Sequence, residues 1–344
     1  MNLPWHEFLS KNGAMIDSGT IIGFGRSAEE IRAARDASIV APLSQFGLFA
    51  ISGADAAGFL HGQLSSDVKA LRPGNAQFAS YCSPKGRVLA NFLLWRQADG
   101  FNALLARDLT ASVRKRLAMF VLRSKVTVVD ASDESVVVGV SGPAAEQAIR
   151  ESVGVVPDAP FSVATADAGA ILALADRRYI VILRRDAAES TWIKLSARLV
   201  AAGEPAWRWL DIRAGVPWIT AATQDQFVPQ MANLELIGAV NFQKGCYPGQ
   251  EIVARTQYLG KLKRRLFAFH ADIGTPPAAG TPLYGADFPD QACGMVVDAA
   301  PAPDGGCDLL AVAQADSAGG ARLASAGGPA LSLLSLPYAV PQPP

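Results

Sequence analysis

The last third of the sequence constrains the fold most. After about residue 262, short apolar runs alternate with clusters of Gly, Pro and Asp, and each run has the length of a strand. The runs cover residues 266–269, 294–297, 309–313 and 331–336. Short strands at this spacing are typical of a small all-β domain, so we expect residues 261–344 to form a β-barrel.

The preceding part of the chain predicts helices and strands in alternation. Residues 109–122 carry apolar side chains at helical spacing, and Asp55 stands where it would cap a short helix that carries Phe59 and Leu60. Further helices are predicted from Pro143 to just before Gly154, and over about 191–202 with Gly203 as the stop signal. Strands are predicted at 78–82, 88–95, 126–129, 136–140, 170–174 and 179–183, the first two joined by a turn at 83–86. The pattern predicts two α+β regions before the β-rich end.

Charge, histidines and cysteines exclude several classes of protein. The 344 residues carry a formal net charge of zero, so a nucleic-acid partner is not indicated by the overall balance. The three histidines are isolated and the four cysteines form no C-x-x-C pair, so we expect neither a metal site nor a disulfide framework. Residues 1–19 lack the features of a signal or transit peptide, and no apolar run is long enough to span a membrane. We therefore expect a cytoplasmic protein.

A glycine pattern near the N-terminus resembles a dinucleotide fingerprint. Gly23, Gly25 and Ala28 match G-x-G-x-x-A. The strand before them covers only residues 20–22, and no acidic residue stands about twenty positions downstream to hold a ribose. We therefore do not expect a nucleotide site here.

The most unusual segment is K-G-C-Y-P-G-Q-E at residues 244–251. Pro248 and Gly249 fit the two central positions of a type II turn. Gly245 lets the backbone approach another group beside Cys246, and Lys244 would favour the thiolate form of that cysteine. Residues 250–258 fit a helix or a strand, and the N-terminal amides of a helix would favour a nearby anion. By itself, a cysteine beside a turn is more often an inert buried thiol than a reactive one.

The same segment carries a family resemblance. Residues 244–255 resemble K-G-C-Y-x-G-Q-E-x-V-A-R, the signature of the YgfZ-like proteins, which are folate-binding relatives of the glycine-cleavage T-protein. Similar segments run along essentially the whole chain, at residues 52–55, 62–68, 82–87, 124–126, 207–217, 227–234 and 336–338.

The resemblance implies a fold and a role. The fold class is α+β, with intertwined α+β domains around a folate site and a C-terminal β-barrel. The implied domains are residues 1–125 together with 206–260 for folate, a ferredoxin-like unit at 126–205, and the barrel at 261–344. The implied ligand is tetrahydrofolate or a derivative. The implied role is to support iron–sulfur enzymes that methylthiolate tRNA, with Cys246 as the functional thiol.

The resemblance also implies folate contacts. Trp207 is similar to a family tryptophan that contacts folate, although core packing explains a tryptophan equally well, and Trp209 and Trp218 are close in sequence. Phe46 stands where another member has tryptophan, and Tyr247 offers a further ring. Within the motif, Gln250, Glu251 and Arg255 would hold the loop, and Arg255 is also a candidate for the folate itself.

One departure from the T-protein bears on activity. The T-protein has paired aspartates where this chain has Ala90 and Asn91. Asn91 can hydrogen-bond to a folate but cannot accept a proton at neutral pH. We therefore do not expect aminomethyl transfer by the T-protein mechanism.

Alternatives remain open at this stage. The basic run of Arg255, Lys261, Lys263, Arg264 and Arg265 is typical of a solvated face, but could also attract the folate tail or, less readily, a tRNA backbone. A folate-dependent one-carbon transferase is the alternative function, with Asp211 or Glu251 as its acid or base. A third hypothesis is a thiol-based redox or cluster-handling protein, in which Cys82 approaches Cys246.

Overall fold

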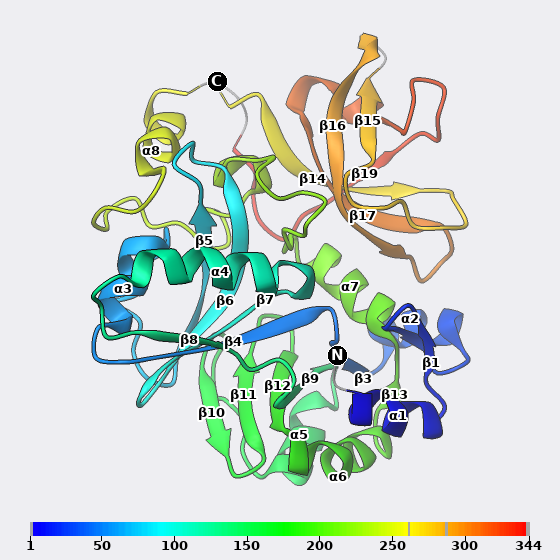
Figure 1. Cartoon of the computed structure of the whole chain (residues 1–344). Helices are drawn as coiled ribbons and strands as arrows, with labels where there is room; N and C mark the ends of the chain where they lie inside the picture. The colour runs from blue at the N-terminus through cyan, green and yellow to red at the C-terminus, as the bar shows by residue number, and fades with distance from the viewer. Residues whose placement is uncertain (1–2, 261, 286–287, 342–344) are drawn as a thin grey trace. The chain divides into compact units, whose positions relative to one another are not determined.

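The computed structural model describes residues 3–260, 262–285 and 288–341, and within them the chain is a mixed α+β protein with four sheets (Figure 1). It divides into two compact units, each assembled from three separate stretches of chain. The first unit comprises Met1–Ala56, Leu71–Gln77 and Leu93–Trp207, and the second comprises Ala57–Ala70, Phe78–Phe92 and Arg208–Pro344. The interleaved stretches mean that neighbours within a unit are often distant in sequence.

A six-stranded sheet organises the first unit. Its order is β10-β11-β12-β9-β3-β13, antiparallel except for the parallel pair of β13 with β3. Apolar side chains that alternate along β9 and β12, such as Val138 and Val181, pack with Trp192 in the core. The strands are β3 Ile39–Pro42, β9 Ser135–Ser141, β10 Val163–Ala166, β11 Gly169–Ala173, β12 Arg178–Arg184 and β13 Val200–Ala201. The helices are α1 Leu3–Lys11, α2 Ser27–Asp36, α5 Ala145–Val153 and α6 Arg185–Ser196, and a hairpin joins β1 Met15–Asp17 to β2 Thr20–Gly23.

The helix predicted at 191–202 is wrong in its bounds. Helix α6 begins six residues earlier, at Arg185, and ends at Ser196, after which Val200 and Ala201 form strand β13. Parallel pairing with Ile39 and Val40 draws this segment into the sheet. The partner strand lies about 160 residues earlier in the chain, so the local apolar pattern could not reveal it.

The loop with the dinucleotide-like glycines binds a carboxylate of its own chain. Glu30 of α2 accepts hydrogen bonds from the amides of Phe24 (2.7 Å), Arg26 (3.1 Å) and Gly203 (3.0 Å). A dinucleotide fingerprint leaves such amides for a phosphate, whereas here an internal side chain uses them.

A five-stranded sheet has the order β5-β6-β7-β4-β8. The predicted strands and the helix at 109–122 are confirmed, and α4 buries Val113 and Leu117. Asp55 directly precedes α3, and its carboxylate accepts the amide of Lys125 at 2.7 Å; its capping of the helix stays a prediction. The elements are β4 Phe46–Ser52, α3 Ala56–Gln63, β5 Ala76–Cys82, β6 Val88–Gln97, β7 Gly100–Ala106, η1 Arg107–Leu109, α4 Thr110–Val121 and β8 Thr127–Asp130.

The β-rich end predicted from the sequence is confirmed as an antiparallel sheet that curls into a half-barrel (Figure 1). Its order is β18-β15-β16-β17-β14-β19, and Phe269, Leu283 and Leu309 lie in its core. The strands are β14 Arg264–Ala271, β15 Pro282–Gly285, β16 Phe288–Pro301, β17 Cys307–Gln314, β18 Arg322–Leu323 and β19 Ser332–Leu334. The remaining elements are α7 Glu204–Arg213, η2 Pro229–Ala232, α8 Gln250–Tyr258 and η3 Ala315–Gly320. Within the described ranges, no helix is both long and apolar enough to cross a bilayer.

Candidate functional site

The cysteine motif forms the turn that its sequence predicts. The amide of Gln250 donates to the carbonyl of Tyr247 at 3.3 Å, and Gly249 has φ 80° and ψ 2°, the values of the third residue of a type II turn. Directly after the turn, the open question about residues 250–258 is decided, because they form helix α8 with Gly249 as its N-cap. The side-chain oxygen of Gln250 accepts the amide of Tyr247 at 3.2 Å, which fixes the loop to the helix.

A second turn supports the first. In residues 83–86, the amide of Gly86 donates to the carbonyl of Ser83 at 2.8 Å. A Cβ on Gly249 would lie 2.6 Å from the Cα of Gly86 and even closer to the carbonyl oxygen of Ser83. A Cβ on Gly86 would lie 2.8 Å from the Cβ of Ile252 in α8. The glycines of both turns therefore allow two backbones to touch.

The 83–86 turn is itself fixed by a third segment. The Ser83 hydroxyl donates to Asp225 at 3.1 Å, and Arg87 donates to the carbonyl of Gln226 at 2.6 Å. The amide of Val88 donates to the carbonyl of Phe227 at 2.8 Å. The cysteine loop thus rests on a backbone framework of three chain segments, all within the second unit.

Lys244 has a structural task. Its ammonium donates to the carbonyls of His61 and Leu64 at the end of α3, the latter at 2.6 Å, and lies 4.9 Å from the ring centroid of Tyr247. A cation here satisfies carbonyls that the helix leaves unpaired and opposes the negative end of its dipole. Burial lowers the pKa of Lys244 to about 8, although the charges of Asp67 and Cys246 act in the opposite direction. The predicted effect of Lys244 on the thiol stays a prediction.

The four cysteines divide sharply by exposure. Cys246 is exposed, whereas Cys82, Cys293 and Cys307 are buried, and all four are free thiols. Burial raises the pKa of Cys82 to about 12 and that of Cys307 to about 11, so these thiols are protonated at neutral pH. Of the four, Cys246 is therefore the one that an external reactant can reach.

Tyr247 faces inward instead of offering an open ring. It is 9% exposed, and burial together with the neighbouring Cys82 raises the pKa of its hydroxyl. One side of its ring carries the Lys244 ammonium. The ring of Tyr247 is therefore packed against groups of the protein and does not present an open face to a ligand.

A histidine that stands isolated in the sequence, His61, lies beside the loop. Nδ1 of His61 is 3.3 Å from Oδ1 of Asp67, and its Nε2 is 3.6 Å from the position of a Cβ on Gly245. The only signal in the sequence was that His61 and Asp67 both lie in or next to the family-like segment 62–68. In the described parts of the chain, no three His, Cys, Asp or Glu side chains gather as a metal would require.

Glu251 and Arg255 lie on the exposed side of α8. Among the described residues, no hydrogen bond joins either side chain to the cysteine loop, so the sequence-based expectation that they hold it finds no support. Arg255 remains open to solvent.

Asn91 is buried and uses both ends of its amide. Nδ2 donates to the carbonyl of Pro217 at 2.9 Å, and Oδ1 accepts the amide of Ile219 at 2.8 Å. An aspartate could accept from Ile219 but could not donate to Pro217. The side chain therefore ties β6 to residues 217–219.

Two predicted ligand contacts, Trp207 and Phe46, belong to the first unit. Trp207 is completely buried: a Cβ on Gly139 would touch its ring, and the guanidinium of Arg178 lies 5.9 Å from the ring centroid. Phe46 is buried at the start of β4, where it pairs with Ala106. Both rings pack in the core.

The indole N–H groups distinguish Trp207 from its neighbours in sequence. Trp209 donates to Asp308 at 2.9 Å, and Trp218 donates to Asp211 at 3.1 Å. Nε1 of Trp207 is buried and has no hydrogen-bond partner among the described residues. A buried donor without a partner is rare and costs free energy.

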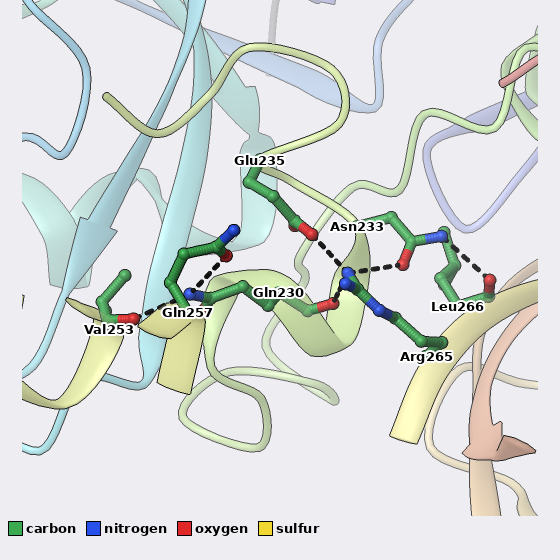
Figure 2. A network of polar contacts seen from close by, with 7 residues as sticks. All are labelled: Gln230, Asn233, Glu235, Val253, Gln257, Arg265 and Leu266. Atoms are coloured by element: carbon green, nitrogen blue, oxygen red, sulfur yellow. Dashed lines mark hydrogen bonds and ion pairs between the residues drawn. The ribbon is translucent and has the colours of Figure 1, made fainter. Parts of the chain in front are cut away.

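The basic run is not a uniform solvated face. Arg265 is buried and forms an ion pair with Glu235, and it also donates to the carbonyl of Gln230 at 2.8 Å (Figure 2). Gln230 donates to the carbonyl of Val253 in α8 at 2.8 Å, and Asn233 donates to Leu266 in β14 at 2.9 Å. Arg265 is thus unavailable to a ligand; Lys263 is exposed, and Lys261 lies outside the described residues.

Comparisons with known proteins identify the family. The GCVT N-terminal domain model matches residues 23–171. The tRNA-modifying protein YgfZ of Sodalis glossinidius is 33% identical over 307 residues, which cover 87% of this chain and 92% of that protein. The chain belongs to the YgfZ family. The YgfZ of Edwardsiella ictaluri is likewise 33% identical, over 85% of this chain and 90% of its own length. The resemblance inferred from residues 244–255 is confirmed.

A solved structure confirms the fold expected of a YgfZ-like chain. The glycine cleavage system aminomethyltransferase T of Bartonella henselae superposes with a TM-score of 0.82 over 98% of this chain and 97% of its own. The two sequences are 18% identical, so this likeness concerns the fold alone.

Proposed function

We propose that this chain is a cytoplasmic, folate-binding accessory protein in tRNA modification, with Cys246 as its functional thiol. Its clients would be iron–sulfur enzymes that methylthiolate tRNA. The observation that carries the proposal is the exposed thiol of Cys246 on a loop built from the family motif and fixed by Gly86 and Gly249. The name shared by the relatives, tRNA-modifying protein, supports the pathway.

The proposed ligand is tetrahydrofolate or a derivative, bound by the domain of residues 1–125 and 206–260. Among the predicted contacts, the feature that fits a polar ligand is the unpaired N–H of Trp207. Tyr247 and Asn91 are already engaged with protein groups. Binding would therefore depend on Trp207 more than on the other two, and would require its surroundings to open.

The alternative of a one-carbon transferase gains no support from the geometry. Of its two candidate bases, Asp211 accepts the indole N–H of Trp218, and Glu251 is exposed to solvent. Asn91 donates to Pro217, which is a structural use of the amide.

Isothermal titration with tetrahydrofolate tests the ligand. Wild type should release heat, Trp207→Ala should bind weakly, and Trp207→Phe should isolate the N–H, because it keeps a ring without the donor. If the folded wild type binds no tetrahydrofolate at saturating concentration, the ligand is wrong.

Complementation tests the thiol. In a bacterium that lacks its own homologue, wild type should restore methylthiolated tRNA, whereas Cys246→Ala should fold and bind folate but fail to restore it. Cys293→Ala, which removes a buried thiol, is the matched control and should restore it. Full restoration by Cys246→Ala would show that the motif serves conformation only.

A further inference from the structure

The residues around Cys246 include a histidine and a carboxylate in a fixed relation. Nδ1 of His61 lies 3.3 Å from Oδ1 of Asp67, and the same oxygen accepts the amide of Ala70 at 3.1 Å. The backbone therefore fixes the carboxylate at ion-pair distance from the imidazole, and Nδ1 makes no hydrogen bond among the described residues. A carboxylate beside Nδ1 favours the tautomer with its proton there, which leaves the lone pair on Nε2.

The free nitrogen faces the cysteine loop. Among the described residues, Nε2 of His61 is the group that a Cβ placed on Gly245 would meet, at 3.6 Å. Gly245 immediately precedes Cys246, whose side chain is exposed. Lys244, on the other side of Gly245, is bonded to the carbonyl of His61 itself, so the helix end and the loop are joined at this point.

The surroundings of His61 disfavour the protonated form of its imidazole. Burial lowers the pKa of His61, the charges of Lys244 and Lys69 lower it further, and Asp67 acts in the opposite direction. A neutral imidazole near neutral pH can accept a proton.

We propose that His61, which lies beside Asp67, is the proton acceptor of the Cys246 thiol. The S–H bond breaks, the proton binds Nε2 of His61, and the electron pair stays on sulfur. Asp67 then stabilises the imidazolium through Nδ1. The thiolate is suited to attack an electrophilic carbon or sulfur that reaches the exposed loop. This inference deepens the proposed function, because it rests on Cys246 as the functional thiol.

The test is the rate of Cys246 alkylation by iodoacetamide in the whole protein, followed by peptide mapping from about pH 6 to about pH 10. His61→Gln should slow alkylation by about tenfold or more near neutral pH and move the midpoint of the profile upward. At the alkaline end, the variant and wild type should converge, because the thiol ionises there without help. His270→Gln, a change of the same kind at a histidine paired with Asp308, should leave the profile unchanged.

Asp67→Asn gives an independent check. It keeps an oxygen for the amide of Ala70 but removes the charge beside Nδ1, so alkylation near neutral pH should slow to a lesser extent. An unchanged profile in His61→Gln, or a rate loss that is equal at every pH, would overturn the proposal. If His61→Gln does not fold, an unchanged profile in Asp67→Asn would overturn it alone.

This assay contains no folate, client enzyme or tRNA, so it separates the proton acceptor from the cellular role of the thiol. A shifted pH profile together with full restoration by Cys246→Ala would keep His61 as the base and reject the functional role of the thiol. An unshifted profile, with Cys246→Ala failing to restore, would reject His61 as the base and keep the functional thiol.

Discussion

Gly249→Ala should lower the free energy of unfolding by more than the strain of placing an alanine in the left-handed conformation. At φ 80° an alanine costs about 1 kcal/mol relative to glycine. Its Cβ would also lie 2.6 Å from the Cα of Gly86 and closer to the Ser83 carbonyl, so two backbone turns must separate. Forced repacking of this kind costs about 1–3 kcal/mol, which gives a total loss of about 2–4 kcal/mol.

Two other glycines separate these contributions. Gly238 has φ 79° with open space where a Cβ would be, so Gly238→Ala should show the conformational cost without the clash. Gly62, in helix α3, has neither the positive φ nor a close neighbour, and Gly62→Ala should be neutral or stabilising by about 0.5–1 kcal/mol.

Urea denaturation of the three variants measures the free energies of unfolding. Gly249→Ala should lose clearly more than Gly238→Ala, and Cys246 should become alkylated at a different rate because its loop has moved. Equal losses at Gly249 and Gly238 would refute the claim that contact between the two turns, and not φ alone, requires glycine in the motif.

Three further predictions follow from the same site. The folded-state pKa of Lys244 is lowered, so the unfolded chain binds more protons than the folded protein between about pH 8 and pH 10.5. Wild type should therefore gain stability relative to Lys244→Met as the pH rises through that window. A difference in urea midpoints that does not depend on pH would contradict this. Asn91→Asp should lower the free energy of unfolding by about 1–3 kcal/mol at neutral pH, because the donor to the Pro217 carbonyl is lost. The variant should also release no ammonia from an aminomethyl-loaded carrier. Measurable turnover would show that a carboxylate at this position is what the chain lacks for aminomethyl transfer. Iodoacetamide should label Cys246 in the native protein and the three buried cysteines only after unfolding, as read by mass spectrometry; early labelling of Cys82 would contradict its burial.

Local chemistry in the sequence predicted several parts of this protein correctly. The turn at Tyr247–Gln250 follows from proline and glycine at its centre, since each restricts or permits φ by itself. The strands after residue 262 and helix α4 follow from the spacing of apolar residues within one continuous segment. The signature at residues 244–255 was sufficient to recognise the family, because it is also continuous in the chain.

Contacts between distant segments decided the rest. Lys244 and His61 are 183 residues apart, yet they meet at the end of α3, and that meeting places an imidazole beside Gly245. The burial of Trp207 and Tyr247 also depends on segments far away in the chain. The sequence therefore left ligand contact and core packing equally open for Trp207 and predicted an available ring at Tyr247, whereas both rings are packed. The sequence by itself determined the local conformation and the family, since φ preferences and periodicity belong to neighbouring residues. Only the tertiary structure decided which side chains are exposed and which groups face the thiol, since burial and pairing depend on which distant segments the fold brings together.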